Sequence, residues 1–449
     1  MPSLRFFTAF ALVSMLFIAG AIVDGLHAVG MVADAVLLVA LFVDARWARS
    51  TPARGSRQWP PLLVQGSTAE VEVVIESMAR RELRLLVRDG LHPGLASHPV
   101  RHRLTIPAGA TATWRFGITP LRRGAHRVLP VTVRILGPLG LAWSQRDLVE
   151  SETRRVYPQI RWRGALGRLL VLAQRRQLGA VRTAFRGHGS DTYGLREYLV
   201  GDPPKSIHWK ATARHGRLIV RDEVLERRGR LIILLDCGRA MASTDGNRSK
   251  LDHALASALA VVRVAAARGD HVSLAAFDNR VRRVARIRGG GREVSAAYRT
   301  FYDLEASLNE PAYDVACDLV TSLERRSTTV MLFTSVIDLA AAELLTRTLQ
   351  RLRRHHRPLL VNLEDPVLGR LALGRPDNPA EAFAKVSGLG ILLANRRLAS
   401  RLRRSGVRTA AAPADRLAVR AVEGYLALSR YRGALGAGRH PRSAQPSRE

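Results

Sequence analysis

Residues 231–236 read LIILLD, five apolar residues that end in an aspartate. A continuous apolar run of this length is typical of a strand that is buried on both faces of a parallel sheet. Helical and strand patterns alternate after it: helix 250–268, strand 271–277, helix 314–325, strand 328–333, helix 339–356, strand 358–363, helix 380–404, a short strand near Val407 and helix 416–430. This alternation predicts a doubly wound α/β domain over residues 230–432, with helices on both faces of a parallel sheet. Alone it indicates a Rossmann-like fold, but no dinucleotide-binding fingerprint is present.

The segment before this domain carries the densest polar pattern of the chain. Residues 194–214 read GLREYLVGDPPKSIHWKATAR. Its noteworthy side chains are Arg196, Glu197, Tyr198, Gly201, Asp202, Lys205, His208, Trp209, Lys210 and Arg214. Glycines stand nearby, but no Gly-Lys-Ser/Thr follows them, so we expect no nucleotide-binding loop. Two interpretations remain open: an ion-paired linker in which Trp209 is a buried apolar anchor between domains, or a surface that binds a partner or ligand.

The order of these residues resembles the signature of the bacterial domain of unknown function 58 family, R-E-Y-x-x-G-D-x-x-R-x-I-x-W-x-x-x-A-R. Lys205 stands in for the usual arginine, and the other signature positions match. The layout of the chain is also similar to that family over roughly residues 5–430. The resemblance implies a membrane-anchored protein with a von Willebrand factor A-like domain, often encoded beside MoxR-type AAA+ ATPases and transglutaminase-like proteins. It implies no enzymatic activity.

A von Willebrand A domain holds Mg²⁺ or Mn²⁺ with a D-x-S-x-S motif directly after its first strand, because hydroxyl and carboxylate oxygens are the ligands that these ions prefer. In this chain Asp236 remains, but Gly238 and Ala240 stand at the two serine positions. Arg239 would place a positive charge beside the ion. Most of the ligand set is therefore missing at this point of the sequence.

Two other positions could compensate for these losses. Thr334-Ser335 stands after the third strand, where the resemblance leads us to expect Thr-Asp. Glu310 or Asp314 lies near the remaining loop position and could offer a carboxylate. These residues do not restore a full set, so we expect Asp236 to cap a helix or pair with an arginine, and we expect no cofactor.

Two apolar segments near the N-terminus predict a membrane hairpin over residues 1–46. Residues 6–23 carry no charge and residues 26–43 carry only Asp34, and each is about 18 residues long, near the lower limit for crossing a bilayer. Asp24-Gly25 between them forces an antiparallel pair if both segments span. A cleaved signal peptide is the alternative interpretation of the first segment. Asp34 is either a functional intramembrane carboxylate or close enough to the outer interface to be hydrated.

Flanking cations predict the orientation of this hairpin. Arg5 precedes it, the turn has no cation, and four arginines follow, at positions 46, 49, 54 and 57. The positive-inside rule therefore places both termini and the soluble domains in the cytoplasm, on the inner membrane. The chain's two cysteines, Cys237 and Cys317, form no disulfide framework and agree with a reducing compartment.

Residues 60–150 have a different pattern from the rest of the chain. Val71, Val73 and Ile75 alternate with glutamates, which is typical of a half-buried strand. Similar short runs follow, separated by turn residues, and they predict a small β-sandwich that serves as an interaction or spacer module. Residues 151–229 are expected to form a linker that contains the motif, and residues 433–449 a disordered tail.

The chain of 449 residues carries a formal charge of +32, and four lysines leave 66 arginines among its 70 basic residues. The arginines are spread along the chain, and no nucleic-acid-binding module is present, so we expect no specific nucleic-acid partner. The charge reflects either compositional bias or attraction to anionic lipid or an acidic partner. An apolar fraction of 47% excludes a mainly disordered chain.

These observations favour a non-enzymatic scaffold or adaptor, anchored in the membrane, whose degenerate von Willebrand A-like domain binds a partner protein. A MoxR-type ATPase is the partner that the resemblance suggests. Two alternatives belong to other classes: a metal-dependent enzyme or binding domain that uses Asp236, and a basic protein that binds polyanions or lipid.

Overall fold

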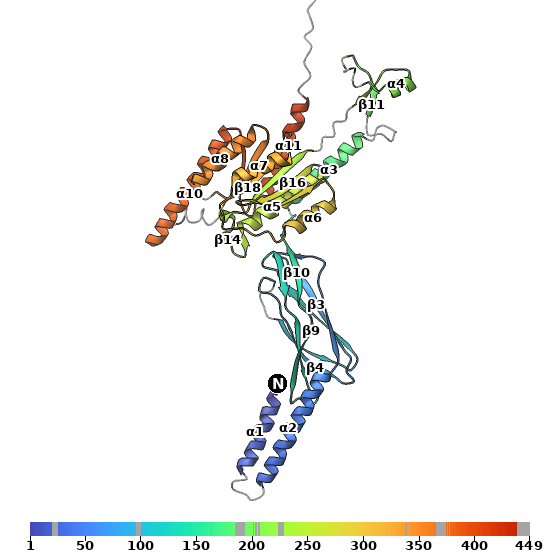
Figure 1. Cartoon of the computed structure of the whole chain (residues 1–449), viewed down its shortest axis with the longest axis vertical. Coiled ribbons are helices and arrows are strands. Elements are labelled where there is room, and N and C mark those ends of the chain that lie inside the picture. The colour runs from blue at the N-terminus through green and yellow to red at the C-terminus, as the bar shows by residue number, and fades with distance from the viewer. Residues whose placement is uncertain are drawn as a thin grey trace, which may run out of the picture. The chain divides into compact units, whose positions relative to one another are not determined.

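The computed structural model describes the chain except residues 20–25, 96–99, 163, 185–193, 201, 203, 205–206, 223–228, 337–338, 365–373, 375, 377 and 438–449. It is a mixed α/β protein with several sheets (Figure 1). The chain divides into two compact units, Met1–Gln159 and Ile160–Glu449. The expected tail lies mostly outside the described residues.

Two helices begin the first unit and lie side by side (Figure 1). These are α1 (Leu4–Ala19) and α2 (Leu26–Ser50), and most of their large apolar side chains are exposed. Of the residues that the structure describes, α2 alone forms a helix long and apolar enough to cross a membrane. Asp34 lies half-buried within α2. The structure thus contains one candidate membrane span and a shorter apolar helix beside it.

The rest of the first unit consists of antiparallel strands, with one parallel pair. They are β1 (Ala53–Gln58), β2 (Leu63–Val64), β3 (Ala69–Ser77), β4 (Leu83–Asp89), β5 (Val100–Ile106), β6 (Thr111–Ile118), β7 (Gly124–Val128), β8 (Val131–Leu136), β9 (Trp143–Val149) and β10 (Glu152–Tyr157). Three sheets result, in the orders β1-β3-β6, β2-β10-β7 and β5-β4-β8-β9. Val71, Val73 and Ile75 of β3 are buried, which confirms the predicted period-two strand.

A buried carboxylate joins α2 to the turn between β8 and β9. Asp44 is fully buried and accepts hydrogen bonds from the backbone N–H groups of Leu139 at 2.7 Å and of Leu141 and Ala142 at 2.8 Å each. These three N–H donors offset the free-energy cost of burying the carboxyl group of Asp44. Gly137 makes room for this contact, because a Cβ there would lie 2.3 Å from an oxygen of Asp44.

The second unit is built on a six-stranded sheet in the order β17-β16-β13-β18-β19-β20, parallel except for the edge strand β17. Its strands are β13 (Arg230–Asp236), β16 (His271–Phe277), β17 (Val281–Ile287), β18 (Thr329–Thr334), β19 (Arg357–Glu364) and β20 (Arg408–Pro413). Its helices are α3 (Ala165–Ala184), α5 (Lys250–Ala267), α6 (Gly291–Phe301), α7 (Tyr313–Leu323), α8 (Leu339–Arg353), α10 (Pro379–Arg404) and α11 (Leu417–Ala437). Each helix and strand that the alternation predicted is confirmed within a few residues, except that α11 is longer.

Helices pack on both faces of this sheet because successive side chains of β13 point to opposite faces. Ile233 belongs to the core that contains residues of α5 and α11, whereas Ile232 and Leu234 belong to the core that contains residues of α7 and α8. Helix α3 falls within the expected linker, yet its Leu166 and Ala173 are buried in the first of these cores. The alternation did not predict α6 or the arginine-rich edge strand β17.

Candidate functional site

The carboxyl end of β13 is where a ligand site is expected in a sheet of this kind. From β13 the chain continues to β16 on one side, and β18 pairs with β13 on the other. Ligands of parallel α/β sheets gather outside the carboxyl ends of the strands where the order reverses. Asp236 is the last residue of β13 and Thr334 the last residue of β18, so two of the predicted site residues meet there.

Both oxygens of Asp236 already have hydrogen-bond donors. Thr334 donates its hydroxyl to Oδ2 at 2.6 Å, and the backbone N–H of Gly238 donates to Oδ1 at 2.7 Å. The hydroxyl of Tyr313 lies 3.3 Å from that of Thr334 and extends the network. Asp236 is fully buried and holds a small polar cluster inside the protein, and it pairs with no arginine in the described contacts.

A loop covers this end of the sheet. The backbone N–H of Arg239 donates to the carbonyl of Asn309 at 2.9 Å, which brings residues 307–312 against the end of β13. A Cβ at Gly238 would lie 2.9 Å from that carbonyl and 3.1 Å from an oxygen of Asp236. Glycine at this position therefore allows the loop to close, and the serine of a metal-binding motif would not fit without a shift.

Asp278, which follows β16, is a second buried carboxylate at this edge, and the sequence analysis missed it. Its oxygens accept from the backbone N–H of Arg280 at 3.1 Å and from the guanidinium of Arg282 at 2.9 Å. Asp278 comes directly after a predicted buried strand, and this position could have identified it from the sequence. Its partners Ser307 and Asn309 could not be predicted, because they lie on a loop that is distant in the sequence. The edge therefore carries two carboxylates in different surroundings.

These surroundings move the two pKa values in opposite directions. Burial raises the pKa of Asp236 to about 6, against the hydrogen bonds from Thr334 and Gly238. Burial also opposes ionisation of Asp278, but hydrogen bonds from Ser307 and the Arg280 N–H, together with the charge of Arg282, outweigh it and lower the pKa. The pKa of Asp236 therefore lies closer to neutrality than that of Asp278.

The residues present do not fit a metal ion. Gly238 and Ala240 supply no side-chain oxygen, and the oxygens of Asp236 are engaged. Glu310 pairs with Arg239 at 2.6 Å at the surface, and Asp314 lies in the first turn of α7. Across the part of the chain that the structure describes, no group of three His, Cys, Asp or Glu side chains could hold a metal. We derive no chemistry through a metal at this edge.

The motif segment forms a small structure of its own. Strand β11 (Gly194–Glu197) pairs antiparallel with β12 (Ile219–Asp222), so that Arg196 lies opposite Val220 and Glu197 opposite Ile219. Helix α4 (Trp209–His215) stands between the two strands in sequence and ends at Gly216, whose φ of 67° is favourable for glycine. Gly201 and Lys205 of the motif lie outside the described residues.

Most polar residues of the motif have local structural contacts. His208 caps α4, because its Nδ1 accepts from the N–H of Ala211 at 3.0 Å, and its own N–H donates to the carbonyl of Ile219 at 2.7 Å. Asp202 accepts from the N–H of Leu199 at 2.9 Å. Glu197 pairs with Arg217. The side chains of Lys210 and Arg214 are exposed on α4, and Tyr198 is half-buried. The motif residues that the structure describes form no catalytic constellation.

Within the second unit, Trp209 of α4 is 67% exposed. The expected role of this residue as an anchor between the two domains stays a prediction. The ring stands in the first turn of α4, where the neighbouring His208 takes the inward, capping position. Leu199, Val200 and Leu218 are exposed as well, at 65%, 101% and 44%. One short segment thus carries four large apolar side chains that are exposed within the second unit.

The fold and these two sites define a mixed α/β protein with a largely parallel sheet, a closed polar cluster at its edge and an exposed motif. Residues 194–376 match the model of the family described as "Protein of unknown function DUF58". This match confirms the resemblance that the motif predicted and identifies the segment as one of that family. No curated protein matches the chain.

Solved structures are similar only at a distance. The conserved hypothetical protein BatB from Bacteroides thetaiotaomicron is 13% identical, over 45% of this chain and 99% of that one, with a TM-score of 0.29. The CARDB domain of the PF1109 protein from Pyrococcus furiosus is 13% identical, over 24% of this chain and 88% of that one, with a TM-score of 0.19.

Proposed function

We propose that this protein is a membrane-anchored cytoplasmic adaptor, without enzymatic activity, whose motif segment binds a partner protein. The observation that carries the proposal is the exposure of Trp209, together with Leu199, Val200 and Leu218, on one short segment. Covering exposed tryptophan and leucine side chains removes apolar surface from water, which favours binding, and aromatic residues dominate the energetics of many interfaces.

The partner that fits the resemblance is a MoxR-type AAA+ ATPase. Helix α4 carries the basic residues Lys210 and Arg214. Arg217 follows the helix and pairs with Glu197. A partner surface that combines an apolar pocket for Trp209 with acidic residues around it would complement this segment. The strand order of the second unit, with an antiparallel edge strand beside β16, supports a von Willebrand A-like domain as the body that presents the motif.

The anchor in this proposal is a hairpin of α1 and α2, with the strands of the first unit as a small sandwich at its base. Ser3, before α1, donates its N–H to the carbonyl of Leu141 at 2.7 Å, and Asp44, near the end of α2, binds the same turn. Both ends of the pair therefore lie on one side, as a hairpin requires. The flanking arginines support the cytoplasmic side.

Two experiments test the proposal. Reporter fusions after residue 50 and at the C-terminus should both give a cytoplasmic signal, and a periplasmic signal at either point would contradict the anchor. A photo-crosslinking amino acid at position 209 of the full chain, in solubilised membranes, should capture the ATPase. The matched control is position 344, where Leu344 is also exposed but lies on α8. Equal capture from both positions would contradict the assignment of the motif.

A further inference from the structure

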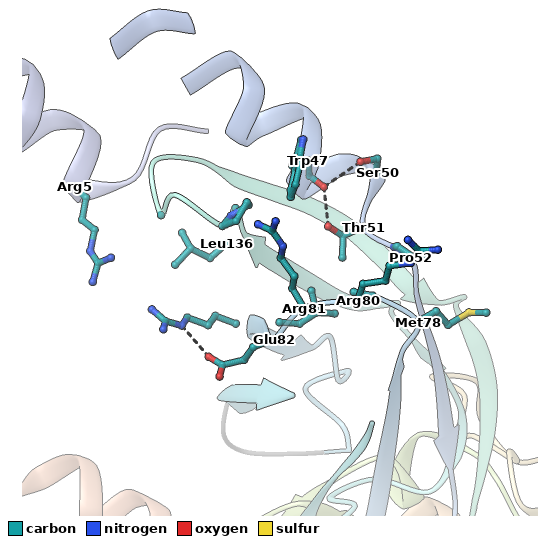
Figure 2. A pocket seen from close by; sticks show the side chains of 16 residues that line it. Arg5, Trp47, Ser50, Thr51, Pro52, Met78, Arg80, Arg81, Glu82 and Leu136 are labelled. Atoms are coloured by element: carbon teal, nitrogen blue, oxygen red, sulfur yellow. Dashed lines mark hydrogen bonds and ion pairs between the residues drawn. The ribbon is translucent and has the colours of Figure 1, made fainter. Parts of the chain in front are cut away.

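A basic pocket lies in the first unit where the two helices meet the strands. It has a volume of about 830 Å³. Its walls come from four segments: the start of α1, the end of α2, the turn between β3 and β4, and the turn between β8 and β9 (Figure 2). Its charged and aromatic lining residues are Arg5, Trp47, Arg80, Arg81, Glu82 and Arg84.

The pocket has more positive charge than its own acidic residue can neutralise. Glu82 pairs with Arg84 at 3.3 Å, and both side chains are more than half exposed. Among the described residues, Arg5, Arg80 and Arg81 have no acidic partner within ion-pair distance. Three guanidinium groups around one cavity form a site for an anion, and their planar forks match the oxygens of a phosphate.

One contact holds Arg81 at this pocket, and Arg5 lies beside a turn that leaves room for it. The guanidinium of Arg81 lies 4.8 Å from the centre of the Trp47 ring, a cation–π contact that Figure 2 shows beside the end of α2. Arg5 passes close to the turn after β8, because a Cβ at Gly140 would lie 3.0 Å from one of its nitrogens. Gly140, with a φ of 73°, both forms the turn and leaves this room.

The surroundings of the pocket indicate where the phosphate comes from. Exposed apolar side chains lie within about one and a half turns of Arg5 or Trp47 along the helices: Leu4, Phe7, Phe42 and Val43. A lipid whose phosphate sits among the arginines would lay its acyl chains along these side chains. Tryptophan and arginine at the end of a membrane helix stand at the depth of the headgroups.

We infer that this pocket binds the phosphate of an anionic phospholipid headgroup, at the cytoplasmic face of the membrane. The inference rests on the proposed anchoring by α1 and α2 and adds a specific lipid site to it. Such a site would favour a negatively charged lipid over a zwitterionic one, and it would fix the base of the helices against the strands.

The experiment measures lipid binding to the purified full chain in a non-ionic detergent, by native mass spectrometry with added phosphatidylglycerol or phosphatidylcholine. The pocket variant R5Q/R80Q/R81Q removes three charges. The matched control R46Q/R49Q/R54Q removes three charges from exposed arginines near the same helix end, outside the pocket. A lysine variant, R5K/R80K/R81K, keeps the charge and shows whether loss of binding needs the guanidinium fork or follows from misfolding.

We expect about tenfold weaker phosphatidylglycerol binding in the glutamine pocket variant, a smaller loss in the lysine variant and less than about a twofold change in the control. Equal losses in both glutamine variants would overturn the inference in favour of diffuse attraction. Displacement of the lipid by millimolar inorganic phosphate would overturn it in favour of a soluble phosphate compound. Membrane fractionation distinguishes failure of the lipid site from failure of the proposed anchor. If the chain is found in the membrane fraction but shows no preference between the lipids, only the lipid site is contradicted.

Discussion

The carboxyl end of β13 and the motif segment are both rich in polar residues, yet the protein treats them in opposite ways. At the end of β13, Asp236 is fully buried, its oxygens are hydrogen-bonded, and a loop covers it. In the motif segment the polar residues hold a short helix and two strands together, while Trp209 remains exposed. Position in the fold alone would point to the first region as the functional site. The burial of Asp236 and the exposure of Trp209 favour the second region instead.

The largest effect expected within this comparison concerns the proton on Asp236. Its pKa of about 6 lies above the ordinary value of 3.8, so the folded state holds a proton more tightly than the unfolded state. The stability that this proton contributes is full below pH 4 and is lost as pH rises through about 6. Asp236→Asn has no carboxyl that ionises here, so its stability should not fall in this way. At pH 8 its free energy of unfolding should exceed that of wild type by on the order of 2–3 kcal/mol.

Thiol labelling of the full chain in urea measures this effect, because both cysteines, Cys237 and Cys317, are buried in the second unit. Asp278→Asn is the matched control with the opposite sign. The pKa of Asp278 is lowered, so its contribution is present above the unfolded pKa and is lost as pH falls. If wild type and Asp236→Asn had parallel pH profiles, Asp236 would not be the buried, proton-binding group described above.

The next effect concerns the closure of the loop over this edge. Gly238→Ser restores one hydroxyl of the metal motif, but its Cβ would lie 2.9 Å from the carbonyl of Asn309. We expect a loss of about 1–3 kcal/mol in the free energy of unfolding, as for other overpacked sites. Gly291→Ser is the control, since a Cβ there meets nothing within 4 Å. A neutral Gly238→Ser would show that the loop opens easily and that the edge is available to a ligand.

The smallest effect on stability is expected from Mg²⁺ or Mn²⁺. A ligand stabilises a protein according to its affinity for the folded state, and the engaged oxygens of Asp236 leave little affinity. Millimolar Mg²⁺ should therefore change the free energy of unfolding of the full chain by less than about 0.5 kcal/mol. A clear stabilisation that disappears in Asp236→Ala would revive the metal-dependent alternative.

Periodic patterns predicted the second unit well because each element is encoded locally. The strand β13 and the alanine-rich helix α5 begin and end within one residue of the predicted positions. The edge strand β17 was not predicted because Arg282, Arg283 and Arg286 interrupt its apolar pattern and one of its faces is exposed. The family motif was likewise readable from the sequence, since its residues are contiguous.

Contacts between distant segments could not be predicted in this way. The donors to Asp44 stand 95 to 98 residues further along the chain, and no pattern in α2 announces them. The basic pocket could not be predicted either, because its lining residues come from four segments that are far apart in the sequence. The surroundings of Trp209 could not be predicted for a related reason, because an aromatic residue in a short helix has the same sequence pattern whether its ring packs against another domain or binds a partner.

If Trp209 serves binding rather than folding, its role can be measured in the binding of a purified MoxR-type ATPase to the full chain in detergent. Trp209→Ala should weaken binding by tenfold or more, on the order of 2 kcal/mol for an interface anchor. Its stability should stay within about 0.5 kcal/mol of wild type, because the ring is exposed. Leu344→Ala, at another exposed site, should change neither quantity. A Trp209→Ala protein that is strongly destabilised, or that binds the ATPase as wild type does, would contradict the account.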